Sequence, residues 1–331
     1  MFSRATLPGR ATARSVLLLL LFAAALITLV LAANLPSSTR YMRLLNDAGH
    51  APVFGALAWI GLRLAGSIER WAKAGAARYF AVFAAVTTIG ILVEVVQSLI
   101  GRDATAADVL TDAAGAACVL FAFAFCERGR DSQGAIRASR AWLLAGALGA
   151  AATIAAPLAR GALAYAEREA AFPHLIRFGH PLSLYFVETH GVRLNAEPLP
   201  ARWANEADDP ALRVQIERRE TPAVMLVEPK ADWSGYELLA LGIINPGPRA
   251  LQLTLRVHDQ EHNQRHDDRF NMRFVVAPAS ARDIAIPLEE IAQAPRNRSM
   301  DLTHIAGVVL FESSANAPVG DAFYITHLTL R

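Results

Sequence analysis

Ionisable and amide side chains interrupt two long apolar runs in the first half of the chain. Glu94 and Gln97 lie three residues apart, and Asp108 and Asp112 lie four residues apart. On a helix, either spacing places the two side chains on one face. A carboxylate inside membrane hydrocarbon costs about 2.5–3.5 kcal/mol on insertion scales, so such residues normally face a bundle interior or water. We therefore expect a polar cluster where two helix ends meet.

The turn between these runs and the start of an earlier run add further polar groups. The expected cluster comprises Asn46, His50, Glu94, Gln97, Arg102, Asp108 and Asp112. In one interpretation, Arg102 pairs with Asp108 and Glu94 and only stabilises the helical hairpin. In the other, the cluster is a functional pocket at the outer leaflet. A catalytic version would use Glu94 or Asp108 as general base. Arg102 would then bind a phosphate, and His50 would move protons.

The composition indicates a membrane protein. The 331 residues are 53% hydrophobic and only 19% charged, whereas soluble proteins carry about a quarter charged residues. A span takes about 20 residues, and five runs qualify: residues 15–34, 51–66, 79–100, 104–125 and 141–163. The first follows three arginines like a signal peptide, but its apolar core exceeds the usual h-region of about 7–15 residues, which favours an uncleaved helix.

Lysine and arginine mark alternate loops of this half. They gather in the N-terminal tail and after the second and fourth apolar runs. By the positive-inside rule, the N-terminus is cytoplasmic and the C-terminal half lies outside, whether or not the first run is cleaved.

The second half changes pattern near residue 170. Prolines 173, 181, 198 and 200 predict an irregular stretch. Short alternating segments then follow, typical of half-buried strands in a β-sandwich or jelly roll. Eight are expected: residues 212–217, 223–228, 236–244, 251–257, 272–276, 283–288, 305–311 and 322–330. The predicted organisation is a tail (1–14), a transmembrane α-helical bundle (15–166), a linker (167–210) and an all-β sandwich (211–331).

The polar residues of the bundle resemble a known family in order and spacing. The matching positions are His50, Glu94-x-x-Gln97, Gly101-Arg102, Asp108 and Gly115. This succession is similar to the VanZ-like domain over about residues 34–125, although Asp112 stands where the family usually has Asn. The family's prototype is linked to glycopeptide (teicoplanin) resistance. The resemblance therefore implies a role in the cell envelope and no particular reaction.

The second half resembles jelly-roll carbohydrate-binding modules of the galactose-binding-like type, beginning with the run Ala231-Asp232-Trp233-Ser234-Gly235-Tyr236. Aromatic faces and planar polar side chains bind sugars. The glycan-binding candidates are Trp203, Trp233, Tyr236, His258, Asp259, Asn263, Asp268 and Arg269. In the alternative interpretation, Trp233 and Tyr236 pack in the core or at its rim, and Asp268 pairs with Arg269.

Cofactor and partner signals are few. His258, His262 and His266 would align on a helix, but their surroundings predict strand and loop, so no metal site is expected. Carboxylates and carbonyls there could still hold a structural calcium ion. The net charge of +2 argues against nucleic acid. Cys118 and Cys126 both lie in or beside one apolar run, so a disulfide framework in the second half is excluded.

The leading hypothesis is a non-catalytic protein of the bacterial inner membrane that contacts lipid and binds a cell-envelope glycan outside. Its role would lie in envelope integrity or glycopeptide tolerance. One alternative is a membrane enzyme acting on a lipid-linked glycan or polyprenyl phosphate. The other is a scaffold that binds a protein partner.

Overall fold

The computed structural model describes residues 13–32, 38–101, 105–128, 136–204, 210–218, 220–314 and 319–331. Arg102 of the expected polar cluster lies outside these residues. The chain divides into two compact units, Met1–Ala162 and Leu163–Arg331. Each unit is described by itself.

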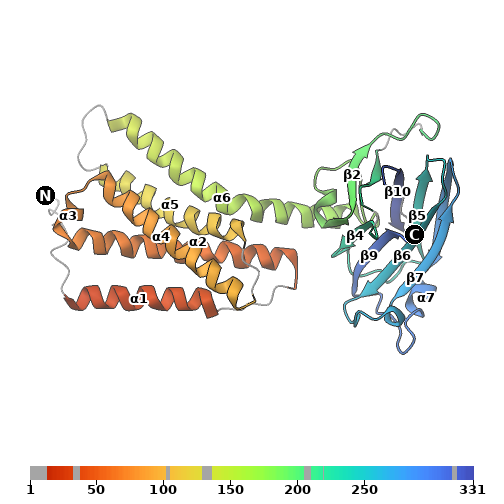
Figure 1. The fold of residues 1–331 in the computed structure, drawn as a ribbon, viewed down its shortest axis with the longest axis horizontal. Helices are drawn as coiled ribbons and strands as arrows, with labels where there is room; N and C mark the ends of the chain where they lie inside the picture. The colour runs from red at the N-terminus through yellow and green to blue at the C-terminus, as the bar shows by residue number, and fades with distance from the viewer. Residues whose placement is uncertain are drawn as a thin grey trace. The chain divides into compact units, whose positions relative to one another are not determined.

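The first unit is helical (Figure 1). Its helices are α1 Ala13–Ala32, α2 Arg40–Ser67, the short α3 Glu69–Ala72, α4 Ala76–Leu99, α5 Ala106–Arg128 and most of α6 Ile136–Ala171. In the described part of the chain, four helical stretches are long and apolar enough to cross a membrane: Ala13–Ala32, Ala76–Leu99, Ala106–Glu127 and Arg140–Ala171. The expected run 51–66 lies in α2, which is not among the four. Asp47, His50 and Arg63 add polar groups to that helix.

Two glycines bring α2, α4 and α5 into close contact. A Cβ on Gly115 of α5 would lie only 2.2 Å from the carbonyl oxygen of Ala51 on α2. A Cβ on Gly90 of α4 would lie 2.9 Å from Asp112 Oδ2 on α5. Small residues that allow backbones to approach are the usual basis of helix packing in membranes. The three helices therefore depend on these positions having no side chain.

The second unit is a sandwich of two antiparallel five-stranded sheets (Figure 1). One sheet has the order β1-β4-β9-β6-β7 and the other β2-β3-β10-β5-β8. The strands are β1 Val187–His190, β2 Val192–Glu197, β3 Ala211–Ile216, β4 Ala223–Val227, β5 Leu238–Asn245, β6 Leu251–Asp259, β7 Phe270–Val276, β8 Ser280–Pro287, β9 Ile305–Glu312 and β10 Ala322–Leu330. Short helices η1 Ser183–Phe186, η2 His266–Asp268 and α7 Leu288–Ala292 complete the unit.

Alternating side chains fill the space between the sheets. On β6, Leu251, Leu253, Leu255 and Val257 are buried in the common core, while the residues between them lie on the opposite face of the sheet. All eight expected strands are present, as β3 to β10. The fold class predicted from the sequence, a helical membrane region followed by a β-sandwich, is thus confirmed.

The prediction of an irregular linker at residues 167–210 is wrong. This interval holds the end of α6, then η1, β1 and β2. The prolines end elements as expected, but residues 182–197 contain none. That proline-free stretch adds edge strands to both sheets, with β1 pairing to β4 and β2 to β3. The unit boundary falls earlier, inside α6, whose Ala164 is buried in the sandwich core.

We expect Gly115→Ala to destabilise the helical unit by about 1–3 kcal/mol, the usual range for overpacking. The reason is that the obstructing atom, 2.2 Å away, is backbone and cannot rotate aside. Thermal unfolding of the full chain in detergent would measure the loss. Gly149→Ala on α6 is the matched control, because nothing lies within 4 Å of its added Cβ. Equal effects of the two substitutions would contradict the close contact.

Candidate functional site

Three ionisable residues converge inside the helical unit, each from a different helix. His50 comes from α2, Glu94 from α4 and Asp112 from α5, and one ligand atom of each lies within 4.8 Å of the others. His50 Nδ1 lies 3.3 Å from Asp112 Oδ1. Glu94 and Asp112 are 6% and 0% exposed. We call these three residues the buried triad.

The glycine contacts position the buried triad. Ala51, which meets Gly115, directly follows His50, and Gly115 lies three residues after Asp112. Gly90, which leaves room for Asp112, lies one helical turn before Glu94. The close backbone approach therefore occurs within one turn of each member of the triad.

The remaining expected cluster residues are engaged elsewhere. Asp108 Oδ2 accepts hydrogen bonds from the Thr105 amide at 3.1 Å and the Thr105 hydroxyl at 2.8 Å, at the start of α5. Gln97 Nε2 donates to the Val30 carbonyl oxygen at 3.2 Å, which joins α4 to α1. Asn46 is half-buried on α2, one turn before His50. The expected set of seven thus divides into a triad and separate structural contacts, with Arg102 outside the described residues.

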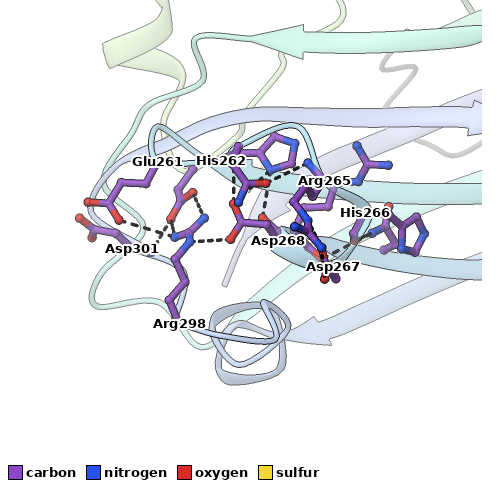
Figure 2. Close-up of polar contacts among 12 residues, drawn as sticks. Glu261, His262, Arg265, His266, Asp267, Asp268, Arg298 and Asp301 are labelled. Atoms are coloured by element: carbon purple, nitrogen blue, oxygen red, sulfur yellow. Dashed lines mark hydrogen bonds and ion pairs between the residues drawn. The ribbon is translucent and has the colours of Figure 1, made fainter.

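In the sandwich, one arginine holds two carboxylates (Figure 2). Arg298 Nη2 donates to Asp259 Oδ1 at 2.7 Å, and its Nη1 donates to Asp259 Oδ2. Its Nε donates to Asp268 Oδ1 at 2.6 Å. Backbone amides occupy the second oxygens: Asp301 N donates to Asp259 Oδ2, and Asn263 N to Asp268 Oδ2, each at 2.9 Å.

The electrostatics of this network favour the charged carboxylates. Burial raises the pKa of Asp259, but the hydrogen bonds from Arg298 and Asp301 outweigh it and hold that pKa below its usual range. The hydrogen bond from Arg298, together with the Asn263 amide, lowers the pKa of Asp268 to about 2. Asp259 and Asp268 therefore brace the loop after β6, and their oxygens are already occupied. Asp268 pairs with Arg298 and not, as expected, with Arg269.

A different set of polar residues lies on the outer face of the sheet that contains β6, β7 and β9. The register pairs Arg256 of β6 with Asn271 of β7 and, on the other side, with Val309 of β9. The Arg256 guanidinium lies 5.3 Å from the centre of the Phe311 ring. His258 follows two residues after Arg256 and lies over Gly307, whose added Cβ would be 2.5 Å from its Cε1 atom. We call Arg256, His258, Arg269, Asn271 and Phe311 the β6–β7 face.

This face carries two guanidinium groups that lack carboxylate partners. Among the described residues, no Asp or Glu forms an ion pair with Arg256 or Arg269, and the Nε atom of each has no hydrogen-bond partner. Burial, with the charge of Arg269, lowers the pKa of Arg256. Burial, with His262 and Arg256, lowers the pKa of His258 to about 4, so its imidazole is neutral at pH 7. The face can therefore receive an anion.

A hollow of about 500 Å³ adjoins this face. Arg269, Asn271, Gln293 and Arg296 are among its lining residues. These groups can form paired hydrogen bonds with hydroxyl or carboxylate groups. The hollow and the face share Arg269 and Asn271.

The other glycan-binding candidates have different surroundings. Trp233 is fully buried at 0% exposed, and its indole nitrogen donates to the Lys230 carbonyl at 2.8 Å, so no ligand can reach its ring. Tyr236 is half-buried, edge-on to Phe172 at 5.3 Å. Trp203 packs on a small separate apolar cluster.

Of the eight expected glycan-binding residues, the β6–β7 face brings together His258 and Arg269. Asn263 is exposed in the loop, where its Oδ1 accepts from the Arg265 amide at 3.0 Å. Arg256, Asn271 and Phe311 of this face are not among the residues expected from the sequence. Arg256 could have been predicted from the alternation of β6, because that alternation places Arg256 on the same side of the strand as the candidate His258.

The histidines at the end of β6 and in the loop after it do not gather with carboxylates around a common point. The His258 and His262 rings are 5.2 Å apart, and His262 Nδ1 lies 3.0 Å from the Asp268 carbonyl oxygen. Within the described part of the chain, ligand atoms of three His, Cys, Asp or Glu residues converge only in the buried triad. A structural calcium ion held partly by carbonyls stays a prediction.

Comparison with known proteins gives no family. No family model matches the chain, and no curated protein matches it. The VanZ-like resemblance therefore stays a prediction. The first unit is a helical region with four candidate membrane spans, and the second is a two-sheet antiparallel β-sandwich.

Solved structures similar to the chain include carbohydrate-binding modules. A family 11 module from Clostridium thermocellum, in complex with a β-1,3-1,4-mixed-linked tetrasaccharide, is 12% identical over 44% of this chain and 88% of that chain, with a TM-score of 0.32. A family 29 module variant complexed with mannohexaose is 14% identical over 44% of this chain and 80% of that chain, with a TM-score of 0.28. An exo-β-agarase is 16% identical over 48% of this chain and 24% of that chain, with a TM-score of 0.38. At these values the similarity concerns the fold and assigns no ligand.

We expect Arg298→Ala to destabilise the loop after β6 by about 3–5 kcal/mol, because it leaves a buried carboxylate, Asp259, without its partner. Faster hydrogen exchange at the end of β6 and the start of β7 would measure this. Arg249→Ala is the matched control. Arg249 also makes two hydrogen bonds to one aspartate, Asp321, but its side chain is 60% exposed. Exposed pairs contribute at most about 1 kcal/mol. Comparable losses in both variants would refute a structural role specific to Arg298.

Proposed function

We propose that this protein is an integral membrane protein whose β-sandwich binds an acidic glycan on the β6–β7 face. The observation that supports this proposal is the pair of guanidinium groups, Arg256 and Arg269, on a strand face where neither has a carboxylate partner among the described residues.

The chemistry of the face suits a sugar acid. A guanidinium presents its N–H groups as a planar fork that matches a carboxylate or phosphate. The Asn271 Nδ2 group donates within the loop, to the His266 carbonyl at 3.2 Å, which leaves its side-chain oxygen to accept from a sugar hydroxyl. An acidic group between Arg256 and Arg269 would offset the mutual repulsion of the two cations. Neutral sugars would lack that contribution.

We expect Arg256→Ala to weaken binding of an acidic glycan at least about tenfold, because a hydrogen bond to a charged group contributes about 1.5–3 kcal/mol. The assay is a glycan array with uronate, phosphorylated and neutral sugars, probed with the full chain in nanodiscs. Arg193→Ala is the control, since Arg193 lies on β2 of the other sheet and pairs with Glu217. Because the pKa of His258 is about 4 and a uronate is already ionised there, affinity for a uronate glycan is expected to stay constant between about pH 5.5 and 8.

Two results would end this proposal. One is the absence of any glycan binding by folded protein. The other is binding that Arg256→Ala leaves unchanged, which would direct attention to the hollow of about 350 Å³ beside Trp203 and His327. If no glycan binds, a protein scaffold that copurifies with one partner would be the better hypothesis.

The proposed location is a bacterial inner membrane, with a cytoplasmic N-terminus and the sandwich outside. This topology needs an odd number of crossings, so α2 is proposed as a fifth span beside the four apolar stretches. The distribution of lysine and arginine supports this orientation, and the VanZ-like resemblance supports a role in envelope integrity or glycopeptide tolerance. The membrane-enzyme alternative has the same orientation.

Labelling tests the orientation. In a background with Cys118 and Cys126 replaced by alanine, Ala277→Cys, at an exposed position directly after β7, should react with a membrane-impermeant maleimide in spheroplasts. Arg70→Cys in α3, also exposed, should react only after permeabilisation. The reverse pattern would invert the proposed topology.

A further inference from the structure

The buried triad is not used by the proposed glycan-binding face, and we infer that His50, Glu94 and Asp112 bind a divalent transition-metal ion within the helical unit. Each ligand comes from a different helix, so the three residues form no metal-ligand motif that is recognisable in the sequence.

The spacing of the triad suits a single ion. Zinc bonds to imidazole nitrogen and carboxylate oxygen are about 2.0–2.2 Å long, so donors around one zinc ion lie about 3–4 Å apart. The separation of 3.3 Å between His50 Nδ1 and Asp112 Oδ1 falls in this range. All three ligand atoms lie within 4.8 Å of one another. Small side-chain rotations are enough to bring them into a common coordination sphere.

The hydrogen bonding of the triad is incomplete without a ligand. Both carboxylate oxygens of Glu94 and both of Asp112 have no hydrogen-bond partner, and neither does His50 Nδ1. Glu94 and Asp112 are also more than nine-tenths buried. A buried polar group without a partner is strongly destabilising, and a buried charge more so. Among the described residues, no lysine or arginine forms an ion pair with either carboxylate.

A divalent cation would both neutralise the buried charge and give the unpartnered oxygen and nitrogen atoms a ligand. Two carboxylates carry two negative charges, which one divalent ion neutralises, and their lone pairs become metal ligands. Protonation of the carboxyls would remove the charges but would add O–H donors that also need acceptors. One imidazole and two carboxylates suit zinc, manganese or ferrous iron.

The surrounding structure fixes the ligands. Gly90 leaves the space that Asp112 Oδ2 occupies against α4. Asp108, one turn before Asp112, accepts hydrogen bonds from Thr105 through Oδ2, and it is not among the residues whose ligand atoms converge. A preorganised set of this kind is what tight metal binding requires.

The test uses the full chain in detergent, with Cys118 and Cys126 replaced by alanine so that thiols contribute nothing. After treatment with chelator, calorimetry with Zn²⁺ and with Mn²⁺ should show 1:1 binding of at least one of them. His50→Ala, Glu94→Gln and Asp112→Asn should each lower the affinity at least about tenfold. Added metal should raise the melting temperature of the unsubstituted protein but not that of these variants.

Glu127→Gln is the matched control. It makes the same chemical change as Glu94→Gln in the helical unit. Glu127, however, lies near the end of α5, away from the triad in sequence, and its carboxylate pairs with Arg78 of α4. It should keep the full metal affinity. Glu94→Gln and Asp112→Asn conserve shape, so they report on coordination even if His50→Ala fails to fold. The inference is overturned if folded protein binds neither Zn²⁺ nor Mn²⁺, or if the triad variants bind as tightly as Glu127→Gln.

Discussion

Every backbone amide and carbonyl removed from water needs a hydrogen-bond partner, and the two units of this chain meet that need differently. In hydrocarbon, a segment that crosses alone must be a helix, because only a helix pairs its own backbone. The four apolar helices follow from this constraint. In the sandwich, partners come from neighbouring strands, so residues as distant as Val192 and Ile216 are joined. In both units the backbone hydrogen bonds fix the helices and strands, and these elements in turn determine where the polar side chains lie.

Both units also bury charged groups, with different consequences. Arg298 supplies hydrogen bonds to Asp259 and Asp268, and amides occupy the remaining oxygens, so that network is closed and structural. Glu94 and Asp112 are buried at least as deeply as Asp268, yet their oxygens have no hydrogen-bond partner, and only His50 lies close to one of them. All four groups are carboxylates, so residue type does not distinguish them. The presence or absence of hydrogen-bond partners does, and it separates the structural network from the candidate binding site.

Local patterns in the sequence predicted much of the fold. The eight expected strands alternate apolar and polar residues, a signal contained within each segment. β1 and β2 were missed because they are short, and three of the four β1 residues are exposed, which leaves little alternation to detect. The helical spacing of Glu94, Gln97, Asp108 and Asp112 predicted shared faces, but not which residues would meet. That selection depends on where Gly90 and Gly115 allow helices to touch.

The long-range pairs could not be predicted at all. Arg298 lies 30 residues from Asp268 and 39 from Asp259, and nothing near Arg298 marks it as their partner. The nearest cation in sequence, Arg269, was the natural choice and is instead on the outer face. Strand register decides such pairings, and register is a property of the assembled sheet.

The sheet orders leave β1, β7, β2 and β8 as edge strands. Each carries a charged side chain, among them Glu188, Arg273, Arg193 and Arg282. Arg282 of β8 also donates at 2.6 Å to the carbonyl oxygen of Val275 on β7, which occupies an acceptor on that open edge. Charged edges discourage another chain from adding a strand. The sandwich is therefore protected against edge-to-edge aggregation, an advantage for a domain that many copies would display along a single membrane.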